Sequence, residues 1–259
     1  MKSIQNLTKT DLENIKLLCF DCDGVTIKEG TFLQENQGEL VVRTSKLTPE
    51  MTKKINWLKN NFYIMFSSGR HPLYLARMYE TILWDKVILQ GENGLLTVFN
   101  GKVSQFENYP MELLKTATKI KADLRRLADS NDKVNGFEPK QFLISLHCQE
   151  DMDEVREIVV KHDVDNEFYC LWSGEAFDVA PKRFNKGNGL KSVVKKLNLK
   201  LENVLAVGND PNDKEMVEEA GISVTTDPES IIQGADFITE KRGVSGGEEI
   251  VNKILELTV

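Results

Sequence analysis

Short apolar segments alternate with amphipathic segments along most of this chain, and this alternation restricts the fold more than any other feature. The strand-like apolar segments span residues 15–21, 62–68, 86–94 and 203–210. The helical segments span residues 48–61, 72–83, 185–199 and 211–221. Short, continuous apolar runs are typical of strands buried on both faces of a parallel sheet, with helices as the crossovers. The pattern therefore predicts an α/β fold with a doubly wound, Rossmann-like parallel sheet.

The alternation stops in the middle of the chain. A long amphipathic helix is predicted at 110–130, and strand segments of alternating polarity follow it. The αββαββ-like order of this block is typical of an antiparallel sheet with helices packed on it. We therefore expect a core formed by residues 1–108 and 182–259, with an α+β domain, residues 109–181, inserted into it.

Two β-hairpins are predicted within the core. The first spans 31–43 and has polar residues at its turn. The second spans 95–107, and Asn100-Gly101 at its tip is a strong signal for a two-residue hairpin loop. A short helix is expected near the C-terminus, at 228–235.

The composition argues against several classes of function. The chain has 259 residues, of which 41% are hydrophobic and 28% charged, as is typical of a globular protein with an ordinary core. Its net charge of −7 argues against nucleic acid as a partner, because non-specific binding needs a basic surface. No apolar run approaches the ~20 residues of a membrane span, and the first residues lack the apolar core of a signal peptide. We expect a reduced, cytoplasmic protein without a membrane partner.

The cysteines raise the question of metal or redox chemistry. Cys19 and Cys22 have the spacing of a CxxC motif, but no second CxxC or paired histidine motif accompanies them. Cys19 also lies in a predicted buried strand, where a free thiol packs as a small apolar side chain. We therefore expect a core thiol and no zinc site there.

Polar clusters stand at the carboxyl ends of the predicted core strands. They are Asp21 with Asp23, the Ser67–Arg70 segment, the segment leading to Lys186, and the Gly208–Asp213 segment. In open α/β sheets ligands bind beyond these strand ends, so clusters that are distant in sequence meet at one point. Two buried carboxylates one residue apart repel each other unless a cation lies between them. Any one cluster is compatible with a turn or a helix cap, but the four together predict a metal-dependent active site.

These four motifs resemble those of the haloacid dehalogenase (HAD) superfamily of aspartate-nucleophile phosphatases. The matching segments are DCDGV, SSGR, NKGNGL and GNDPND, and the resemblance covers the whole core. An insert between the serine and lysine motifs is, in this superfamily, a type 2 (C2B-like) cap. The αββαββ form resembles the caps of trehalose-phosphate, mannosylglycerate-phosphate and sucrose-phosphate phosphatases and of phosphomannomutase. The C-terminal stretch is also similar to phosphatases of keto-deoxy sugar acids, which usually lack this cap.

The resemblance implies a role for each motif residue. Asp21 would attack phosphorus and form an aspartyl-phosphate. Asp23 would protonate the leaving alcohol and then deprotonate the attacking water. Lys186 would neutralise charge on the phosphate and the nucleophile together. The residues that would bind the phosphate are Ser68, Gly69, Arg70 and Asn212.

The resemblance also implies Mg2+, a hard cation that carboxylates, water and phosphate can share. Its ligands would be the carboxylate of Asp21, the backbone carbonyl of Asp23 and one side chain of the fourth motif. The superfamily usually has GDxxND there, whereas this chain has GNDPND, so Asn209 stands where the metal-binding aspartate is expected. A neutral amide oxygen should hold Mg2+ less tightly than a carboxylate. The third ligand stays open between Asn209, its neighbour Asp210 and Asp213, which would otherwise hold the motif lysine or a metal-bound water.

The predicted function is a Mg2+-dependent phosphomonoesterase that hydrolyses a small phosphorylated sugar or sugar acid through an aspartyl-phosphate intermediate. A phosphomannomutase-type phosphomutase is the first alternative, but the insert offers only Arg125, Arg126 and Arg156, all in predicted helices, for a second phosphate. A non-catalytic phosphosugar-binding module is the second, suggested by Asn209. The third has phosphoglycolate or another small acid as the substrate. The expected partner is a small phosphorylated metabolite, and the sequence gives no oligomeric state.

Overall fold

The structure is a computed structural model that describes residues 1–36, 38–227, 229, 232 and 234–258. The chain divides into two compact units. The core unit comprises Met1–Glu29, Ser45–Phe106 and Asn185–Val259, and the inserted unit comprises Gly30–Thr44 and Glu107–Phe184. Among the described residues, no helix is long and apolar enough to cross a membrane.

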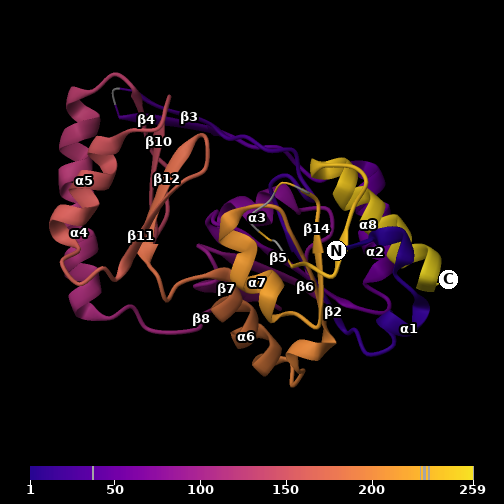
Figure 1. Cartoon of the computed structure of the whole chain (residues 1–259). Coiled ribbons are helices and arrows are strands. Elements are labelled where there is room, and N and C mark those ends of the chain that lie inside the picture. The colour runs from indigo at the N-terminus through magenta and orange to yellow at the C-terminus, as the bar shows by residue number, and fades with distance from the viewer. Residues whose placement is uncertain (37, 228, 230–231, 233, 259) are drawn as a thin grey trace. The chain divides into compact units, whose positions relative to one another are not determined.

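A nine-stranded sheet forms the centre of the core unit, in the order β1-β15-β14-β13-β2-β5-β6-β7-β8 (Figure 1). Its strands are β1 (Lys2–Ser3), β2 (Leu17–Asp21), β5 (Tyr63–Ser67), β6 (Val87–Gly91), β7 (Leu96–Phe99), β8 (Lys102–Gln105), β13 (Val204–Gly208), β14 (Ile222–Thr225) and β15 (Phe237–Ile238). In this sheet order, every strand from β1 at the edge through to β6 runs parallel to its neighbours. The strands β7 and β8 then extend the sheet with antiparallel pairing. The chain builds outward from β2 in one direction through β5 and β6, and in the other through β13 to β15. This reversal puts a topological switch point beside β2, where open α/β sheets bind ligands.

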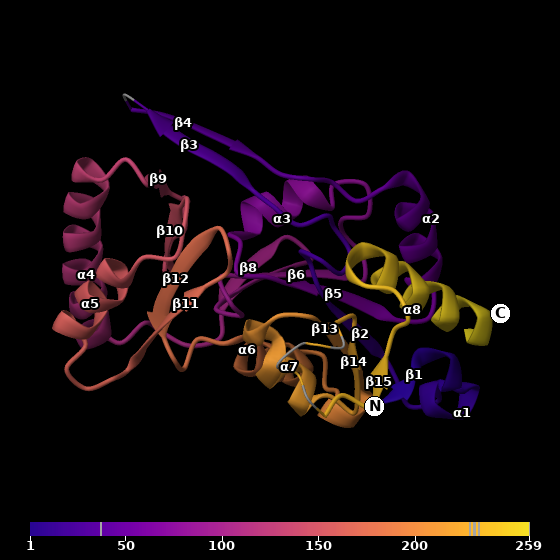
Figure 2. The ribbon, with the colours of Figure 1, turned by 45° about the horizontal axis from the view of Figure 1, so that its top comes forward.

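Helices cover both faces of this sheet, as the sequence pattern predicts. The core-unit helices are α1 (Lys9–Leu12), α2 (Pro49–Leu58), α3 (Pro72–Met78), α6 (Lys186–Lys196), α7 (Lys214–Glu219) and α8 (Gly243–Thr258), with short 3-10 turns η1 (Ile4–Asn6), η2 (Leu201–Asn203) and η3 (Pro211–Asp213). Leu18 and Phe20 of β2 pack in one apolar cluster with α2, α3 and α8, whereas Leu17 and Cys19 pack in another with α6 and α7. Figure 2 shows α2 beside α8, and α6 beside α7.

The CxxC cysteines are separated by this alternation. Cys19 is buried in the cluster on the α6 and α7 side, where its Sγ lies 3.4 Å from Met216 Sδ. Cys22 is buried in the opposite cluster, and both are free thiols. The two side chains therefore do not form a joint metal or disulfide site.

The inserted unit is an antiparallel sheet with two helices on one face (Figures 1 and 2). The sheet order is β11-β12-β10-β9, with β9 (Val134–Phe137), β10 (Ile144–Cys148), β11 (Phe168–Trp172) and β12 (Ala176–Pro181). The helices are α4 (Met111–Ser130) and α5 (Asp153–His162). Leu146, Phe177 and Val179 pack against apolar residues of both helices, so alternate strand residues form this unit's own core.

The hairpin of β3 (Phe32–Asn36) and β4 (Glu39–Arg43) belongs to the inserted unit. The predicted hairpin at 31–43 is confirmed, but the predicted domain ranges placed it in the core. Contacts with distant residues explain the difference: the carboxylate of Glu35 accepts hydrogen bonds from Arg125 at 3.0 Å and from the backbone of Phe137 at 3.4 Å. The predicted range 109–181 otherwise lies inside the inserted unit, which begins its second segment at Glu107 and ends at Phe184.

The second predicted hairpin is confirmed by β7 and β8. Asn100 and Gly101 both have positive φ, 48° and 73°, as a two-residue turn of this kind requires. The strand β9 was not among the predicted elements, because Asn135 and Gly136 interrupt its apolar pattern. The short helix predicted at 228–235 falls largely outside the described residues.

Candidate active site

The site is built on the carboxyl ends of adjacent parallel strands. Asp21 is the last residue of β2 and pairs in register with Ser67, the last residue of β5. On the other side of β2, the strand β13 ends at Gly208, and the fourth motif follows it. The parallel arrangement therefore brings three of the four predicted polar clusters to one edge of the sheet.

Lys186 joins the first motif to the fourth. It is the first residue of α6, and its Nζ lies 2.6 Å from Asp21 Oδ1 and 2.6 Å from Asp213 Oδ1. Its side chain is 1% exposed, and both carboxylates are buried as well. Gly187 lets α6 come this close to α7, because a Cβ there would lie 2.7 Å from Glu215 Cβ. The predicted contact of Asp213 with the motif lysine is thus present.

The electrostatics of this buried trio favour additional positive charge. Burial and the negative charge of Asp213 raise the pKa of Asp21 well above its usual range, against the effect of Lys186. Burial alone would lower the pKa of Lys186, but the two carboxylates outweigh it and raise that pKa above its usual range. Both directions have one cause, which is that two carboxylates share a single ammonium group away from water.

Asp213 also fixes the backbone of the fourth motif. Its Oδ2 accepts hydrogen bonds from the backbone N–H groups of Asn209 at 3.0 Å and Asp210 at 3.1 Å. Gly208 leaves room for this carboxylate, since a Cβ there would lie 2.5 Å from Asp213 Cβ. One carboxylate oxygen of Asp213 therefore binds Lys186, and the other binds two backbone amides of the loop. Asp213 thus fixes the fourth motif relative to Lys186.

The side-chain amide of Asn209 faces the first motif. One of its terminal atoms lies 3.2 Å from Asp21 Oδ2 and 3.3 Å from the backbone oxygen of Asp23. The surroundings of the Asp210 carboxyl group raise its pKa to about 6, first through burial and then through the charge of Asp213. Of the three candidate third ligands, Asn209 is the one placed beside the other two oxygens.

This arrangement fits a hard divalent cation. With its oxygen turned inward, Asn209 would complete a set of three oxygens that a cation such as Mg2+ prefers, and separations near 3 Å suit neighbouring ligands in an octahedron. With its nitrogen turned inward, the same amide would donate hydrogen bonds to the two oxygens. Across the described residues no group of three His, Cys, Asp or Glu side chains could hold a metal. The candidate ligand set of Asp21, Asp23 and Asn209 is not such a group, because Asp23 contributes its backbone carbonyl and Asn209 its side-chain amide.

Arg70 contacts the predicted acid–base residue. Its Nε and Nη2 donate to the two oxygens of Asp23 at 2.8 and 2.7 Å, a bidentate pair. The arginine is buried, while a quarter of the Asp23 side chain is exposed. Sequence reasoning placed Arg70 on the phosphate and did not anticipate this pairing.

The serine motif is held by the turn after β6. The backbone oxygen of Ser68 accepts from Asn93 N at 3.0 Å, and that of Arg70 accepts from Glu92 N at 2.9 Å. Ser68 is buried, its Oγ accepts from the backbone N–H of Arg70 at 3.2 Å, and Gly69 beside it is half-buried. The loop that carries these residues is therefore fixed before any ligand binds.

Two further residues complete the comparison with the sequence. Asn212 lies in η3, and its buried Oδ1 has no hydrogen-bond partner within the described part of the chain. Gln90 was missed: it is fully buried on β6, its Oε1 accepts from Ser67 Oγ at 3.1 Å, and its backbone oxygen accepts from Ser68 N at 2.9 Å. A glutamine inside an apolar strand was the available signal, because buried amides need partners.

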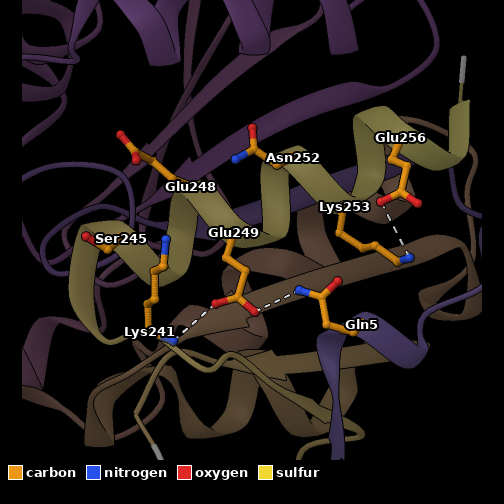
Figure 3. Close-up of a pocket in the computed structure, with 8 residues that line it drawn as sticks. All are labelled: Gln5, Lys241, Ser245, Glu248, Glu249, Asn252, Lys253 and Glu256. Atoms are coloured by element: carbon orange, nitrogen blue, oxygen red, sulfur yellow. Dashed lines mark hydrogen bonds and ion pairs between the residues drawn. The ribbon is translucent and has the colours of Figure 1, made fainter.

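A hollow in the core unit lies along α8 and has a volume of about 210 Å³ (Figure 3). Several of its polar groups pair with one another: Glu249 accepts from the side chain of Gln5 at 3.1 Å and from the backbone of Lys241 at 3.1 Å, and Lys253 lies 3.7 Å from Glu256. None of the predicted site residues lines it. The candidate active site is therefore the strand-end cluster.

Comparisons with known proteins agree with this fold. A phosphoglycolate phosphatase of Methanosarcina acetivorans is 25% identical over 216 residues, which cover 83% of this chain and 91% of the relative. One of Methanobrevibacter smithii is 25% identical over 190 residues, covering 68% of this chain and 80% of that protein. The solved structure of Aspergillus fumigatus trehalose-6-phosphate phosphatase has a TM-score of 0.62 at 15% identity, covering 99% of this chain and 98% of that one.

The sequence model of the haloacid dehalogenase-like hydrolase family matches residues 115–246, which are half of the chain. The predicted fold class, an α/β core with a doubly wound parallel sheet and an inserted α+β unit, is confirmed, and so is the predicted enzyme class of phosphatase. The chain belongs to the haloacid dehalogenase-like hydrolase family.

Proposed function

We propose that this protein is a Mg2+-dependent phosphomonoesterase that forms an aspartyl-phosphate on Asp21 and acts on a small phosphorylated sugar or sugar acid. The observation that carries the proposal is the placement of Asp21. Lys186 holds its Oδ1 at 2.6 Å, and its Oδ2 faces Asn209 and the carbonyl of Asp23. One oxygen is thus oriented by a fixed cation, and the other lies where a metal and a phosphate would meet.

The first half of the reaction transfers the phosphoryl group to the protein. A carboxylate oxygen of Asp21 attacks phosphorus, the new P–O bond forms, and the bond to the substrate oxygen breaks. Asp23 gives its proton to the leaving alkoxide. Lys186 stabilises the negative charge shared by the nucleophile and the phosphate, while Ser68 and Asn212 donate hydrogen bonds to phosphoryl oxygens.

The second half returns the protein to its starting state. Asp23, now a carboxylate, takes a proton from a water molecule, and the hydroxide attacks phosphorus as the bond to Asp21 breaks. Mg2+, bound by Asp21, the Asp23 carbonyl and Asn209, would supply Lewis-acid stabilisation of the phosphoryl charge. The products are inorganic phosphate and the dephosphorylated alcohol.

Arg70 is better supported as a partner of Asp23 than as a direct phosphate ligand. Both of its contacting nitrogens are used by the Asp23 carboxylate. The pair orients Asp23 in its ionised form, which is the form needed as the base. Protonation of Asp23 for the first half of the reaction would weaken these bonds, so we assign Arg70 to the acid–base step.

Two substrate classes are the leading candidates. Sugar phosphates and sugar-acid phosphates follow from the resemblance of the inserted unit to caps of sugar-phosphate phosphatases. Phosphoglycolate is favoured because the two archaeal relatives are phosphoglycolate phosphatases. The phosphomutase alternative gains no support: within the predicted insert, 109–181, Arg125 pairs with Glu35, and Arg126 and Arg156 pair with aspartates.

The test is phosphate release from p-nitrophenyl phosphate, a panel of sugar phosphates and phosphoglycolate, with Mg2+ and with EDTA. We expect turnover that EDTA removes and that Asp21→Asn abolishes, while Asp85→Asn on an exposed turn leaves it unchanged. Asn209→Asp should lower the Mg2+ concentration for half-maximal activity, because a carboxylate replaces an amide oxygen. Saturable binding of a phosphate ester without turnover would instead support the binding module.

A further inference from the structure

The backbone that carries the nucleophile is held by a side chain five residues away. Asp21 ends β2, so its carbonyl leaves the sheet ladder and needs another partner. Thr26 Oγ lies 3.2 Å from that carbonyl and 3.3 Å from the carbonyl of Cys22. The Cys22 carbonyl also accepts from the backbone N–H groups of Thr26 at 3.0 Å and Ile27 at 2.9 Å. The loop after the nucleophile is therefore tied back to the strand end through Thr26.

Tyr79 holds Thr26 from the opposite side. It caps α3, is fully buried, and its hydroxyl lies 2.7 Å from Thr26 Oγ. Thr26 Oγ has one hydrogen, and with that hydrogen on a carbonyl of the strand end, Tyr79 is the donor to Thr26. The Tyr79 hydroxyl also lies beside the Cys22 thiol.

The ring of Tyr79 is fixed independently of its hydroxyl. It stacks on Phe66 of β5 with ring centroids 3.9 Å apart, and Phe66 stacks on Phe20, the residue before Asp21, at 6.2 Å. Replacing Tyr79 by phenylalanine would keep this aromatic stack and remove one hydroxyl. The chain therefore offers an isosteric way to test the hydroxyl alone.

We infer that Tyr79 is a positioning residue for the nucleophile, acting through Thr26 on the backbone of Asp21. The inference rests on the proposed function. In this arrangement α3, which directly follows the serine motif, determines the position of the Asp21 carboxylate relative to the phosphate site. Both residues are buried, Thr26 at 1% and Tyr79 at 0% exposure, so the effect is on geometry and not on chemical participation.

Steady-state kinetics on Tyr79→Phe, Thr26→Val and the double variant test the inference at a temperature where all are folded. Each single variant should lower kcat by about tenfold to a hundredfold at nearly constant KM, because small misplacements of a nucleophile cost this much. The double variant should lose no more than the worse single one, since both break the same chain of bonds. Thr26→Ser keeps the hydroxyl, so its kcat should be close to that of the wild type and well above that of Thr26→Val.

Tyr63→Phe is the matched control. Tyr63 lies at the opposite end of β5, where it contacts Phe99, and its variant should match the wild type. An unchanged kcat in Tyr79→Phe, additive effects in the double variant, or failure of Thr26→Ser to restore kcat would overturn the inference.

Amide hydrogen exchange separates this inference from the proposed function. Tyr79→Phe should speed exchange at the Thr26 and Ile27 amides, whereas Tyr63→Phe should not. If the wild type releases phosphate from no ester, the proposed function fails, but the exchange experiment still decides whether Tyr79 braces this loop. Unchanged exchange in Tyr79→Phe would refute the brace whatever the activity.

Discussion

Replacing Lys186 by methionine should destabilise the core unit strongly. Methionine has a similar length and no charge, so packing in the 1% exposed site is largely kept. The change leaves the carboxylates of Asp21 and Asp213 buried without their cation. Removing one partner of a buried ion pair typically costs about 3–5 kcal/mol. For a unit of this size that corresponds to a melting temperature lower by about 6–20 °C.

The pH dependence of this loss identifies its cause. In Lys186→Met the Asp21 carboxylate, whose pKa burial and the charge of Asp213 already raise, loses the cation that opposes this rise, so its folded pKa lies above that of the unfolded chain. The folded variant therefore binds more protons than the unfolded variant, and its deficit grows as pH rises above about 4 and shrinks as pH falls toward that value. A deficit caused by lost packing would not change with pH.

Urea unfolding of wild type and variant, followed by circular dichroism at about pH 7.5 and about pH 5, measures this deficit. The control is Lys191→Met on the same helix, whose ion pair with Glu219 is 46% and 35% exposed. An exposed pair of this kind contributes at most about 1 kcal/mol. A Lys186→Met deficit no larger than that of the control, or one that is independent of pH, would refute the reasoning.

Three further predictions concern other contacts. Gly187→Ala places a Cβ 2.7 Å from Glu215 Cβ, so it should lower stability by about 1–3 kcal/mol in thermal unfolding. Arg70→Met removes both hydrogen bonds to Asp23 and should lower kcat about 100-fold, whereas an unchanged kcat would contradict its assignment. Hydrogen bonds from a lysine and a histidine of α5 lower the pKa of Asp123 to about 2. The ionised Asp123 carboxylate therefore contributes to the stability of the fold above about pH 4. This contribution is lost as pH falls toward 2, so the difference in melting temperature between wild type and Asp123→Asn should close over that range.

The sequence was sufficient for the parts of the site that local pattern determines. The first, second and fourth motifs each stand where an apolar run meets polar residues, and in a parallel sheet those points share one edge. This is why Asp21, Ser67 and Gly208 end neighbouring strands, whereas Lys186 meets Asp21, 165 positions away, from the first turn of α6. Periodicity and strand ends carry that information directly.

Other features depend on contacts that no local pattern encodes. The β3–β4 hairpin joins the inserted unit because Glu35 finds Arg125, 90 positions away. The partner of Arg70 depends on the side-chain geometry of two loops. Tyr79 was placed in a helical segment with nothing to distinguish it, because its hydroxyl acquires meaning only where α3 ends against the loop after β2. Sequence reasoning identifies the strand ends, and packing decides which side chains meet there.

The asparagine at position 209 changes the charge balance of the site as well as its affinity for a metal. The ion-paired groups of the site are three carboxylates, those of Asp21, Asp23 and Asp213, and two cations, those of Lys186 and Arg70, and together they carry one net negative charge. An aspartate at position 209 would add one more negative charge. With a divalent cation bound, the site is therefore one charge more positive than it would be with that aspartate. Coulomb attraction for a phosphate dianion is stronger in the first case, so weaker metal binding and stronger phosphate binding have the same origin. Asn209→Asp should accordingly lower the Mg2+ requirement and raise the KM for the phosphate ester, and a fall in both would contradict this balance.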